Sequence, residues 1–551
     1  MRLKLIFSAF LISFILIIGK LFYLQIINPY TQQDDLYLKT RKILPQRGKI
    51  YDRLGQPLAV NTTNYLLYIE PKKIVDKYLF VKKIEDILKI GEATLEAKMD
   101  LSKDWVAVKV VDKETKTKLL ATELAGIGFE NRSQRYYPEA SLSAHILGIV
   151  GKKDNGEDIG YFGIEGFYDK DLAGLPGLLK SERDLLDKPM LIGTQEKIDP
   201  EDGRDLYLTI DKAAQEIVKK KLLQGLESYK AKEGCVIVAN PYTMEIIALS
   251  CLPDFDQDKY YEFTDNFFRN SAISNLYEPG SIFKPLIVAA GIESKSIKPD
   301  EIYNEEGPVN IGEYTIRTWD NKYEGKISMT RILEKSSNVG MVYIGEKMGE
   351  KKVYDYVKKF GFGELTNIDL QGEVAGYLKS PANWYPIDYA TVTFGQGIVV
   401  TPIQMITAFS SIINDGKLLK PYIVAKASSS DKDKVAEPKV IRQTISAKTS
   451  AIIKKMLVDT VEHGEVNWAK PKGYKIGGKT GTAQIALQGK YDASKTIASF
   501  IGFAPADKPK FIALVVLKEP QSSIWGSETA APLFFDIAKD LLVYYNIAPE
   551  Q

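Results

Sequence analysis

One uninterrupted apolar segment near the amino terminus constrains this chain more than any other feature. Residues 5–27 are apolar apart from one lysine, one glutamine, one glycine and two serines, and about 20 such residues match the hydrocarbon core of a bilayer. Arg2 and Lys4 precede the segment, so the positive-inside rule predicts that residues 1–4 stay in the cytoplasm and the rest lies outside. The segment exceeds the usual length of a signal-peptide core, and no small-x-small cleavage site follows it. We therefore expect an uncleaved anchor rather than a cleaved signal peptide.

Lys20 is the charged residue within this segment. Its side chain can extend to the outer interface, as long cationic side chains do near the ends of membrane helices. Alternatively it contacts a partner helix, because intramembrane charge is costly and is retained mainly at functional positions. The sequence favours neither interpretation.

The overall composition is that of a globular protein with a single anchor. The 551 residues suffice for roughly three or four domains. Hydrophobic residues at 45% and charged residues at 26% exclude a disordered, collagen-like or multi-span membrane chain. A formal net charge of +2 argues against nucleic-acid binding through a strongly basic surface.

Histidine and cysteine are both scarce. His145, His463, Cys235 and Cys251 do not form a zinc-binding pattern, and the chain contains no HExxH run, so we expect no metal and no cofactor. Catalysis should then rest on Lys, Ser, Asp, Glu or Tyr rather than on a histidine base. The two cysteines flank a predicted hairpin. They either form a disulfide or, as the sequence favours, remain two buried thiols.

Patterns along the chain predict a region of small elements followed by a larger domain. Residues 47–61 alternate around a glycine turn and predict a hairpin. The glycine-rich residues 135–177 predict loops that join short elements, and the polar run KIDPEDGRD indicates a domain boundary near residue 200. Residues 427–438, with the run ASSSDKDK, are expected to form a surface loop.

Beyond that boundary, strand-like and helix-like segments are interleaved. Long helices packed on a mostly antiparallel sheet are the α+β expectation for this pattern. The strand-like segments are VIVAN, EIIALS, KIGGKTGTAQ, SFIGFAP and FIALVVL, and the helix-like segments are SIFKPLIVAAGIES, MTRILEKSSNVGMVYIGEKM and PIQMITAFSSIIND.

A Ser-x-x-Lys motif lies at the start of one predicted helix. Ser281 and Lys284 follow a Pro-Gly break in EPGSIFK, and residues three apart on a helix share a face, with Cβ atoms about 5–6 Å apart. A serine hydroxyl is a weak nucleophile until a neighbour takes its proton. A desolvated lysine, whose pKa burial lowers, can be that neighbour. Alone the motif is a weak signal, because a helix start with a surface lysine explains it as well.

Two further motifs follow in order. Ser336 and Asn338, in KSSNVG, offer a hydroxyl and an amide from a turn between helices, although the same residue types also cap helices. Residues 479–482, KTGT, lie on a predicted strand where glycine permits close backbone approach, and their side chains can bind a carboxylate. A bulged strand explains this motif equally well. Together, an S-x-x-K, an S-x-N about 55 residues later and a K-T-G near the carboxyl end follow the order of penicilloyl-serine transferases.

The chain resembles the class B penicillin-binding proteins over nearly its whole length. RGKIYDRLGQPLA, RYYPEASLSAHILGIVG and GIEGFYDKDLAGLPG are similar to boxes of their amino-terminal pedestal. LYLTID, ANPYTMEIIAL, EPGSIFKP, KSSNVGM, FGQGIVVTPIQM and GGKTGTAQ are similar to their transpeptidase domain. A β-lactamase is shorter and lacks the pedestal. The roughly 20 residues between the anchor and Arg47 leave no room for the glycosyltransferase domain of a class A enzyme. Ile282 departs from the pattern, since the family often has threonine there.

The resemblance implies a serine-type D,D-transpeptidase that cross-links peptidoglycan stem peptides and releases D-alanine. The resemblance implies that Ser281 is the nucleophile and Lys284 is its base. It also implies that Ser336 and Asn338 transfer protons and hold the substrate amide, and that Lys479 sets the local potential and supports Ser336.

The third motif is implied to bind the substrate carboxylate, or that of a β-lactam, through Thr480, Gly481 and Thr482. The family's oxyanion hole uses backbone N–H groups, which correspond here to those of Ser281 and Thr482.

The resemblance also implies the domain order and the cellular setting. Catalysis would take place outside the cytoplasmic (inner) membrane of a bacterium, with β-lactam antibiotics as covalent ligands and a SEDS-type glycosyltransferase and division proteins as partners. EPGS, FGQGIVVTPIQ and IGFAPADKPKFIALVVLKEP favour the septal, division type over the elongation type. The implied parts are a cytoplasmic tip (1–4), a transmembrane anchor (5–27), an elongated dimerisation-type pedestal (28–200) and a serine β-lactamase-like transpeptidase domain with an antiparallel sheet flanked by helices (201–545).

Two alternatives differ in what happens to the acyl group. A D,D-carboxypeptidase or β-lactamase would pass it to water, but no deacylating glutamate can be identified from spacing. A non-catalytic sensor or scaffold would bind β-lactams without turnover. A sensor usually carries a cytoplasmic signalling region, and intact motifs argue against a scaffold.

Overall fold

The computed structural model describes residues 2–27, 38–100, 102–153, 157–182, 195–429, 432–487 and 490–550. The chain divides into two compact units, residues 1–48 with 173–204 and residues 49–172 with 205–551. Each unit therefore draws on two separate stretches of sequence.

The first unit contains the predicted anchor and a small sheet. Helix α1 (Arg2–Phe22) and a π-helical turn (Tyr23–Ile27) include one segment, Ile6–Ile26, that is long and apolar enough to cross a membrane. Its apolar side chains are exposed, Phe10 by 75%, which is favourable in lipid and unfavourable in water. The unit also holds a three-stranded antiparallel sheet in the order β1 (Leu38–Ile43), β8 (Gly177–Glu182) and β9 (Gln195–Ile198).

The second unit begins with the predicted hairpin. Strands β2 (Ile50–Tyr51) and β3 (Pro57–Ile69) pair antiparallel. Asp52 closes the turn, because its Oδ1 accepts hydrogen bonds from the backbone N–H groups of Leu54 (2.9 Å) and Gln56 (2.8 Å). The hairpin predicted from alternation around a glycine is confirmed.

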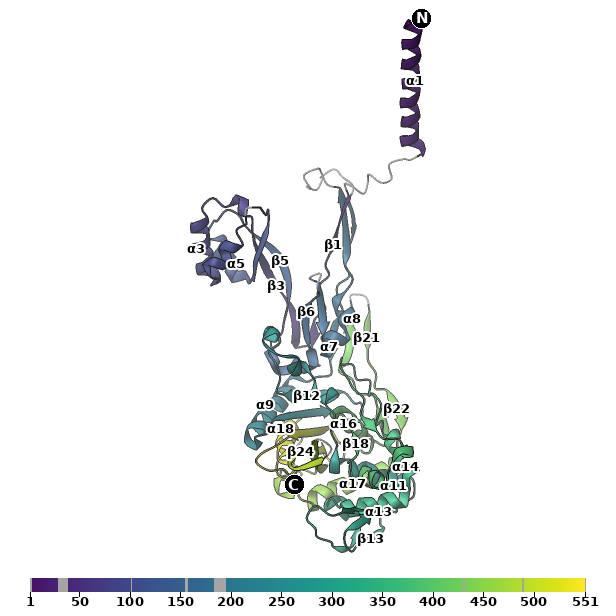
Figure 1. The fold of residues 1–551 in the computed structure, drawn as a ribbon. Coiled ribbons are helices and arrows are strands. Elements are labelled where there is room, and N and C mark those ends of the chain that lie inside the picture. The colour runs from purple at the N-terminus through teal and green to yellow at the C-terminus, as the bar shows by residue number, and fades with distance from the viewer. Residues whose placement is uncertain are drawn as a thin grey trace. The chain divides into compact units, whose positions relative to one another are not determined.

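Strand β3 continues into a lobe with its own core. It pairs antiparallel with two strands, and three amphipathic helices bury their apolar stripes against the resulting sheet (Figure 1). Phe80 and Ile84 pack there near Leu67. The other elements of the lobe are β4 (Val106–Val111), β5 (Ile127–Tyr136), α3 (Lys77–Leu88), α4 (Glu92–Ala97) and α5 (Lys113–Leu120).

The large core of the second unit is a five-stranded antiparallel sheet in the order β12-β11-β25-β24-β23. The five predicted strand segments supply all five strands, which are β11 (Glu233–Ala239), β12 (Ile246–Leu252), β23 (Gly477–Leu487), β24 (Lys490–Ala504) and β25 (Phe511–Lys518). Two helices cover one face and three cover the other (Figure 1). The first face is covered by α9 (Lys212–Tyr229) and α18 (Ala530–Tyr544). The other face is covered by α11 (Lys284–Glu293), α16 (Pro402–Ser411) and α17 (Ala447–His463). The α+β prediction is confirmed.

Further helices and strands lie between these elements in the sequence. The helices are α6 (Ala144–Leu147), α7 (Gly163–Phe167), α8 (Asp169–Ala173), α10 (Ser271–Ser274), α12 (Met329–Glu334), α13 (Asn338–Met348), α14 (Glu350–Lys359) and α15 (Pro386–Val392). The strands are β6 (Ile149–Lys152), β7 (Asp158–Tyr161), β10 (Asp205–Leu208), β13 (Ile302–Glu305), β14 (Val309–Ile311), β15 (Tyr314–Ile316), β16 (Gly325–Ser328), β17 (Tyr377–Leu378), β18 (Ile398–Val399), β19 (Lys417–Leu419) and β22 (Val440–Gln443).

Two local expectations are wrong. Cys235 and Cys251 form a disulfide and are not two buried thiols. They are directly opposed on β11 and β12, a register that brings Cβ atoms to about 5 Å. Residues 427–428 and 433–435 of the predicted loop 427–438 belong instead to an antiparallel strand pair, β20 (Val424–Ser428) and β21 (Asp433–Val435). Strand β21 lies at the edge of its sheet with its side chains exposed, so its polar composition is tolerated.

A buried ion pair joins β5 to α7. The Nε of Arg135 lies 2.6 Å from Oε1 of Glu165, and their side chains are 4% and 0% exposed. Arg135 also donates to the side chain of Asn61 on β3 at 3.0 Å. Removing one partner of such a pair leaves an uncompensated charge in the interior, which costs far more than the net value of the pair itself.

We expect Glu165→Ala to lower the free energy of unfolding by about 3 kcal/mol, because the buried guanidinium of Arg135 loses its counter-ion. The exposed pair of Lys118 and Glu114, at 2.7 Å, supplies the matched control. Glu114→Ala should cost far less than Glu165→Ala, because solvent screens an exposed pair. Denaturant titration of the detergent-solubilised protein measures both variants, and equally small losses would contradict this assignment.

Candidate active site

The first motif begins on a tight turn. Gly280 has φ +58°, a conformation that favours glycine, and its N–H donates to the carbonyl of Gly395 at 2.9 Å. A 3-10 turn covers Gly280–Phe283, and α11 begins at Lys284. The predicted α-helix therefore starts three residues later than expected. The shared face is kept, because residues three apart eclipse each other in 3-10 geometry.

Lys284 connects the first motif to the second. Its Nζ donates to the carbonyl oxygen of Ser336 (2.5 Å), to Oδ1 of Asn338 (2.8 Å) and to Oγ of Ser336 (3.1 Å). The residue is 0% exposed. Burial, together with the charge of Lys479, lowers the pKa of Lys284 well below its usual value. The arrangement therefore favours a neutral amine held among hydrogen-bonding oxygens.

The second motif occupies the turn between α12 and α13. Ser336 has φ +56°, a costly conformation for a residue with a side chain, which the surrounding contacts must hold in place. Ser337 is the cap residue of α13: its Oγ accepts from the N–H of Gly340 at 2.9 Å and donates to the buried carboxylate of Glu305. Helix capping thus explains Ser337, while the residues on either side of it contact Lys284.

The third motif lies on β23, at the edge of the central sheet. Lys479 is 2% exposed and its Nζ lies 3.0 Å from Oγ1 of Thr480. Burial lowers the pKa of Lys479 to about 8, against an opposing contribution from Glu465. At Gly481 a Cβ would lie 2.4 Å from Oγ of Ser499, so this position requires glycine.

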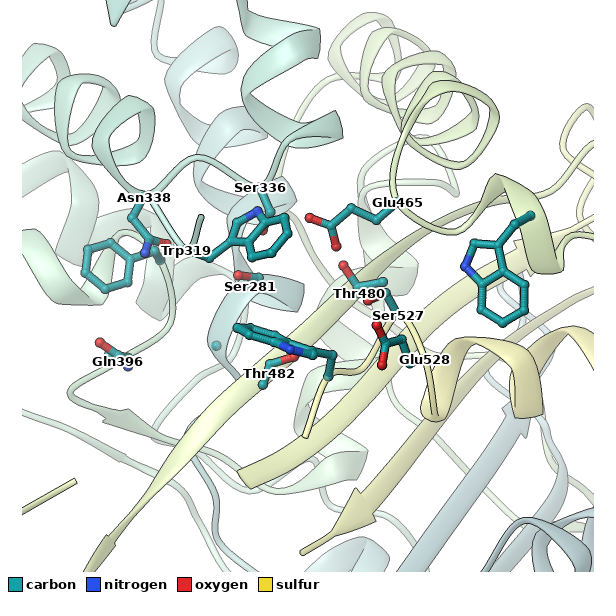
Figure 2. Close-up of a pocket in the computed structure, with 14 residues that line it drawn as sticks. Ser281, Trp319, Ser336, Asn338, Gln396, Glu465, Thr480, Thr482, Ser527 and Glu528 are labelled. Carbon is teal, nitrogen blue, oxygen red and sulfur yellow. The ribbon is translucent and has the colours of Figure 1, made fainter. Parts of the chain in front are cut away.

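The three motifs meet at one pocket. Ser281, Ser336, Asn338, Thr480 and Thr482 all line it, and Figure 2 shows the other four grouped around Ser281. The two motif lysines lie behind this lining, fully enclosed by protein. Gly481, the remaining predicted residue, lies on β23 between Thr480 and Thr482, where a side chain would meet Ser499. The structure therefore brings together all eight predicted residues.

Sequence reasoning missed much of the pocket wall. Trp319, Trp468 and Trp525 line it, as do Glu465 and Glu528, and the rings of Trp319 and Trp525 meet edge to face at 5.4 Å. One signal was present: these tryptophans sit in polar stretches, RTWDNK, EVNWAK and SSIWGS, where a buried core residue is not expected.

Comparison with known proteins agrees with this geometry. Residues 234–539 match the penicillin binding protein transpeptidase domain, and residues 42–208 match the penicillin-binding protein dimerisation domain. The chain belongs to the class B penicillin-binding proteins. The family expected from the motifs and from the pedestal and transpeptidase boxes is thereby confirmed.

Individual relatives can be aligned with most of this chain. Stage V sporulation protein D of Bacillus subtilis is 33% identical over 522 residues, 92% of this chain and 79% of the relative. Peptidoglycan D,D-transpeptidase FtsI of Escherichia coli is 27% identical over 562 residues, 100% of this chain and 92% of the relative. The crystal structure of Penicillin Binding Protein 2X from Streptococcus thermophilus shares the fold, with a TM-score of 0.78 at 24% identity, over 93% of this chain and 80% of the other.

We expect the acylation rate with a fluorescent penicillin to fall as pH rises through about 8, where Lys479 loses the charge that attracts a carboxylate. It should also fall at acidic pH, below the lowered pKa of Lys284, because only a neutral amine accepts a proton. Measuring the acylation rate across pH tests both the fall at acidic pH (the acidic limb of the profile) and the fall at alkaline pH (the alkaline limb). Lys479→Arg keeps its charge, so an alkaline limb that stays near pH 8 in this variant would contradict the assignment to Lys479.

Proposed function

We propose that this protein is a peptidoglycan D,D-transpeptidase that cross-links stem peptides through an acyl-enzyme on Ser281. The observation that carries the proposal is Lys284, a fully buried amine whose hydrogen bonds join the first motif to the second. The third motif completes the same pocket. A serine, a buried lysine and a carboxylate-binding strand are the parts that acyl transfer from a D-Ala-D-Ala terminus requires.

In the acylation half, Oγ of Ser281 attacks the carbonyl carbon of the penultimate D-alanine. The neutral amine of Lys284 takes the hydroxyl proton, and the N–H groups of Ser281 and Thr482 stabilise the oxyanion. The C–N bond then breaks. The hydroxyl of Ser336 relays the proton from Lys284 to the leaving nitrogen, so D-alanine departs as a neutral amine and an ester remains on Ser281.

In the second half, an amine of a neighbouring stem attacks the ester carbonyl. Its proton passes through Ser336 and Lys284 back to Oγ of Ser281, and a new amide bond forms the cross-link. Thr480 and Thr482 hold the donor's carboxylate during acylation, and the buried charge of Lys479 sets a local potential that favours it. A penicillin mimics that donor, but its leaving nitrogen stays tethered after ring opening and blocks the acceptor.

The anchor and the relatives support a proposal for the cellular setting. We place residues 1–4 in the cytoplasm, 5–27 in the bacterial cytoplasmic membrane, a pedestal at 28–200 and the catalytic domain at 201–545 outside it. The division-type segments EPGS, FGQGIVVTPIQ and IGFAPADKPKFIALVVLKEP support a role at the division septum, where a SEDS-type glycosyltransferase and division proteins would be partners. The name of the Bacillus subtilis relative supports spore formation as a second setting.

Covalent labelling by a fluorescent penicillin tests the nucleophile and its base. We expect Ser281→Ala to abolish labelling and Lys284→Ala to slow it by at least about 100-fold, the usual contribution of a general base. Lys298→Ala, an exposed lysine beyond α11, is the matched control and should label at the rate of the unmodified protein. Full-rate labelling of Ser281→Ala would refute the assignment.

Product analysis separates transfer from hydrolysis. With a pentapeptide donor and an acceptor amine, we expect a cross-linked product together with free D-alanine. A hydrolase would release D-alanine and the tetrapeptide alone. The transpeptidase proposal is lost if only hydrolysed tetrapeptide forms at every acceptor concentration while Ser281 is acylated.

A further inference from the structure

Glu465 lies in the active-site pocket, yet it belongs to none of the three motifs. It lines the outer pocket with Ser281 and Ser336. It also lines a small inner cavity beside Lys479. Figure 2 shows its carboxylate directed toward the space between Ser336 and Thr480. Glu465 therefore borders both the pocket that holds Ser281 and the inner cavity that holds Lys479.

The local sequence fixes this position. Helix α17 ends at His463, and a Cβ on Gly464 would lie 2.2 Å from the carbonyl oxygen of Thr460, so only glycine lets the chain turn there. Val466 is 3% exposed and anchors the next residue in the core. Glu465 is thus held between a tight turn and a buried side chain rather than on a loose loop.

The charges around Glu465 come from several elements. The cations that act on it are Lys284 of α11 and Lys479 of β23, and Asp320, which follows β15, opposes them. Glu334 of α12 lines the inner cavity, but its carboxylate lies 3.1 Å from Arg331. Glu528 lines the outer pocket. In the part of the chain that the structure describes, Glu465 is the carboxylate that acts on both buried lysines.

We propose that Glu465 is a positioning residue that balances the charge of Lys284 and Lys479 and so sets the pH range in which the site acylates. This inference rests on the proposed function of the same pocket. A charge on either buried lysine disfavours a charge on the other, and without a nearby carboxylate both would lose their protons more readily. The carboxylate lets Lys479 stay charged near neutral pH while Lys284 serves as a neutral base.

The separation between the carboxylate and the lysines matters for this role. Among the described residues Glu465 forms no ion pair with either lysine, so its effect acts through space. A direct contact with Lys284 would stabilise the ammonium and remove the base. A carboxylate at a greater distance raises the proton affinity of both lysines without holding either one protonated.

The test is the pH dependence of acylation by a fluorescent penicillin, measured on the full-length protein in detergent. Glu465→Gln removes the negative charge and keeps the shape. We expect both limbs of the profile to move to lower pH by roughly one unit, the size of one partly screened charge. Glu465→Asp keeps the negative charge, so its pH profile should lie close to that of the unmodified protein. Glu462→Gln, on the same segment but paired with Lys470 at 2.5 Å outside the pocket, should leave both limbs unchanged.

Each other outcome overturns the inference in a distinct way. If neither limb moves in Glu465→Gln and the bound label is released at the unmodified rate, Glu465 has only a structural role, whether or not acylation is slower. Unmoved limbs with slower release of the bound label show that it activates water instead. Absence of labelling in the unmodified protein, or full labelling of Ser281→Ala, is instead a failure of the proposed function.

Discussion

The burial of the Lys284 amine is the interaction on which the rest of the site depends. An ammonium group taken out of water loses several kcal/mol of solvation. The interior around α11 is apolar and offers three oxygens but no directly paired carboxylate among the described residues. The neutral amine is therefore favoured, and a neutral amine next to a serine is a base. Histidine, nearly absent from the chain, is not needed.

The fold serves this arrangement by bringing three distant stretches of sequence together at a sheet edge. Strand β23 is at the edge of the sheet, so one of its sides is not paired with another strand of that sheet. Thr480 and Thr482 of this strand line the pocket. The turns that complete the site are all sterically demanding: Gly280 and Ser336 have positive φ, and Gly481 leaves no room for a side chain. Such positions are retained when the packing around them specifies a single geometry.

Much of the fold and the motif residues could be predicted because their signals are local. Apolar, partly alternating segments marked all five strands of the central sheet, and the order of the motifs marked Ser281 and the two lysines. The disulfide could not be predicted, because it depends on which residues of β11 and β12 are opposed. The 3-10 turn at Ser281 was missed because helix-start signals do not distinguish it from an α-helix. Glu465 and Trp468 became visible only once the turn after α17 placed them against β23.

A direct measurement of the Lys284 pKa tests this account at its centre. Lysines labelled with ¹³C at Cε can be titrated by NMR in the detergent-solubilised protein, with the Lys284 signal assigned from its loss in Lys284→Arg. The account predicts that this lysine titrates well below the usual value of 10.5. A Lys284 signal that titrates at the usual value would show that the amine is protonated at neutral pH, and the mechanism built on it would be wrong.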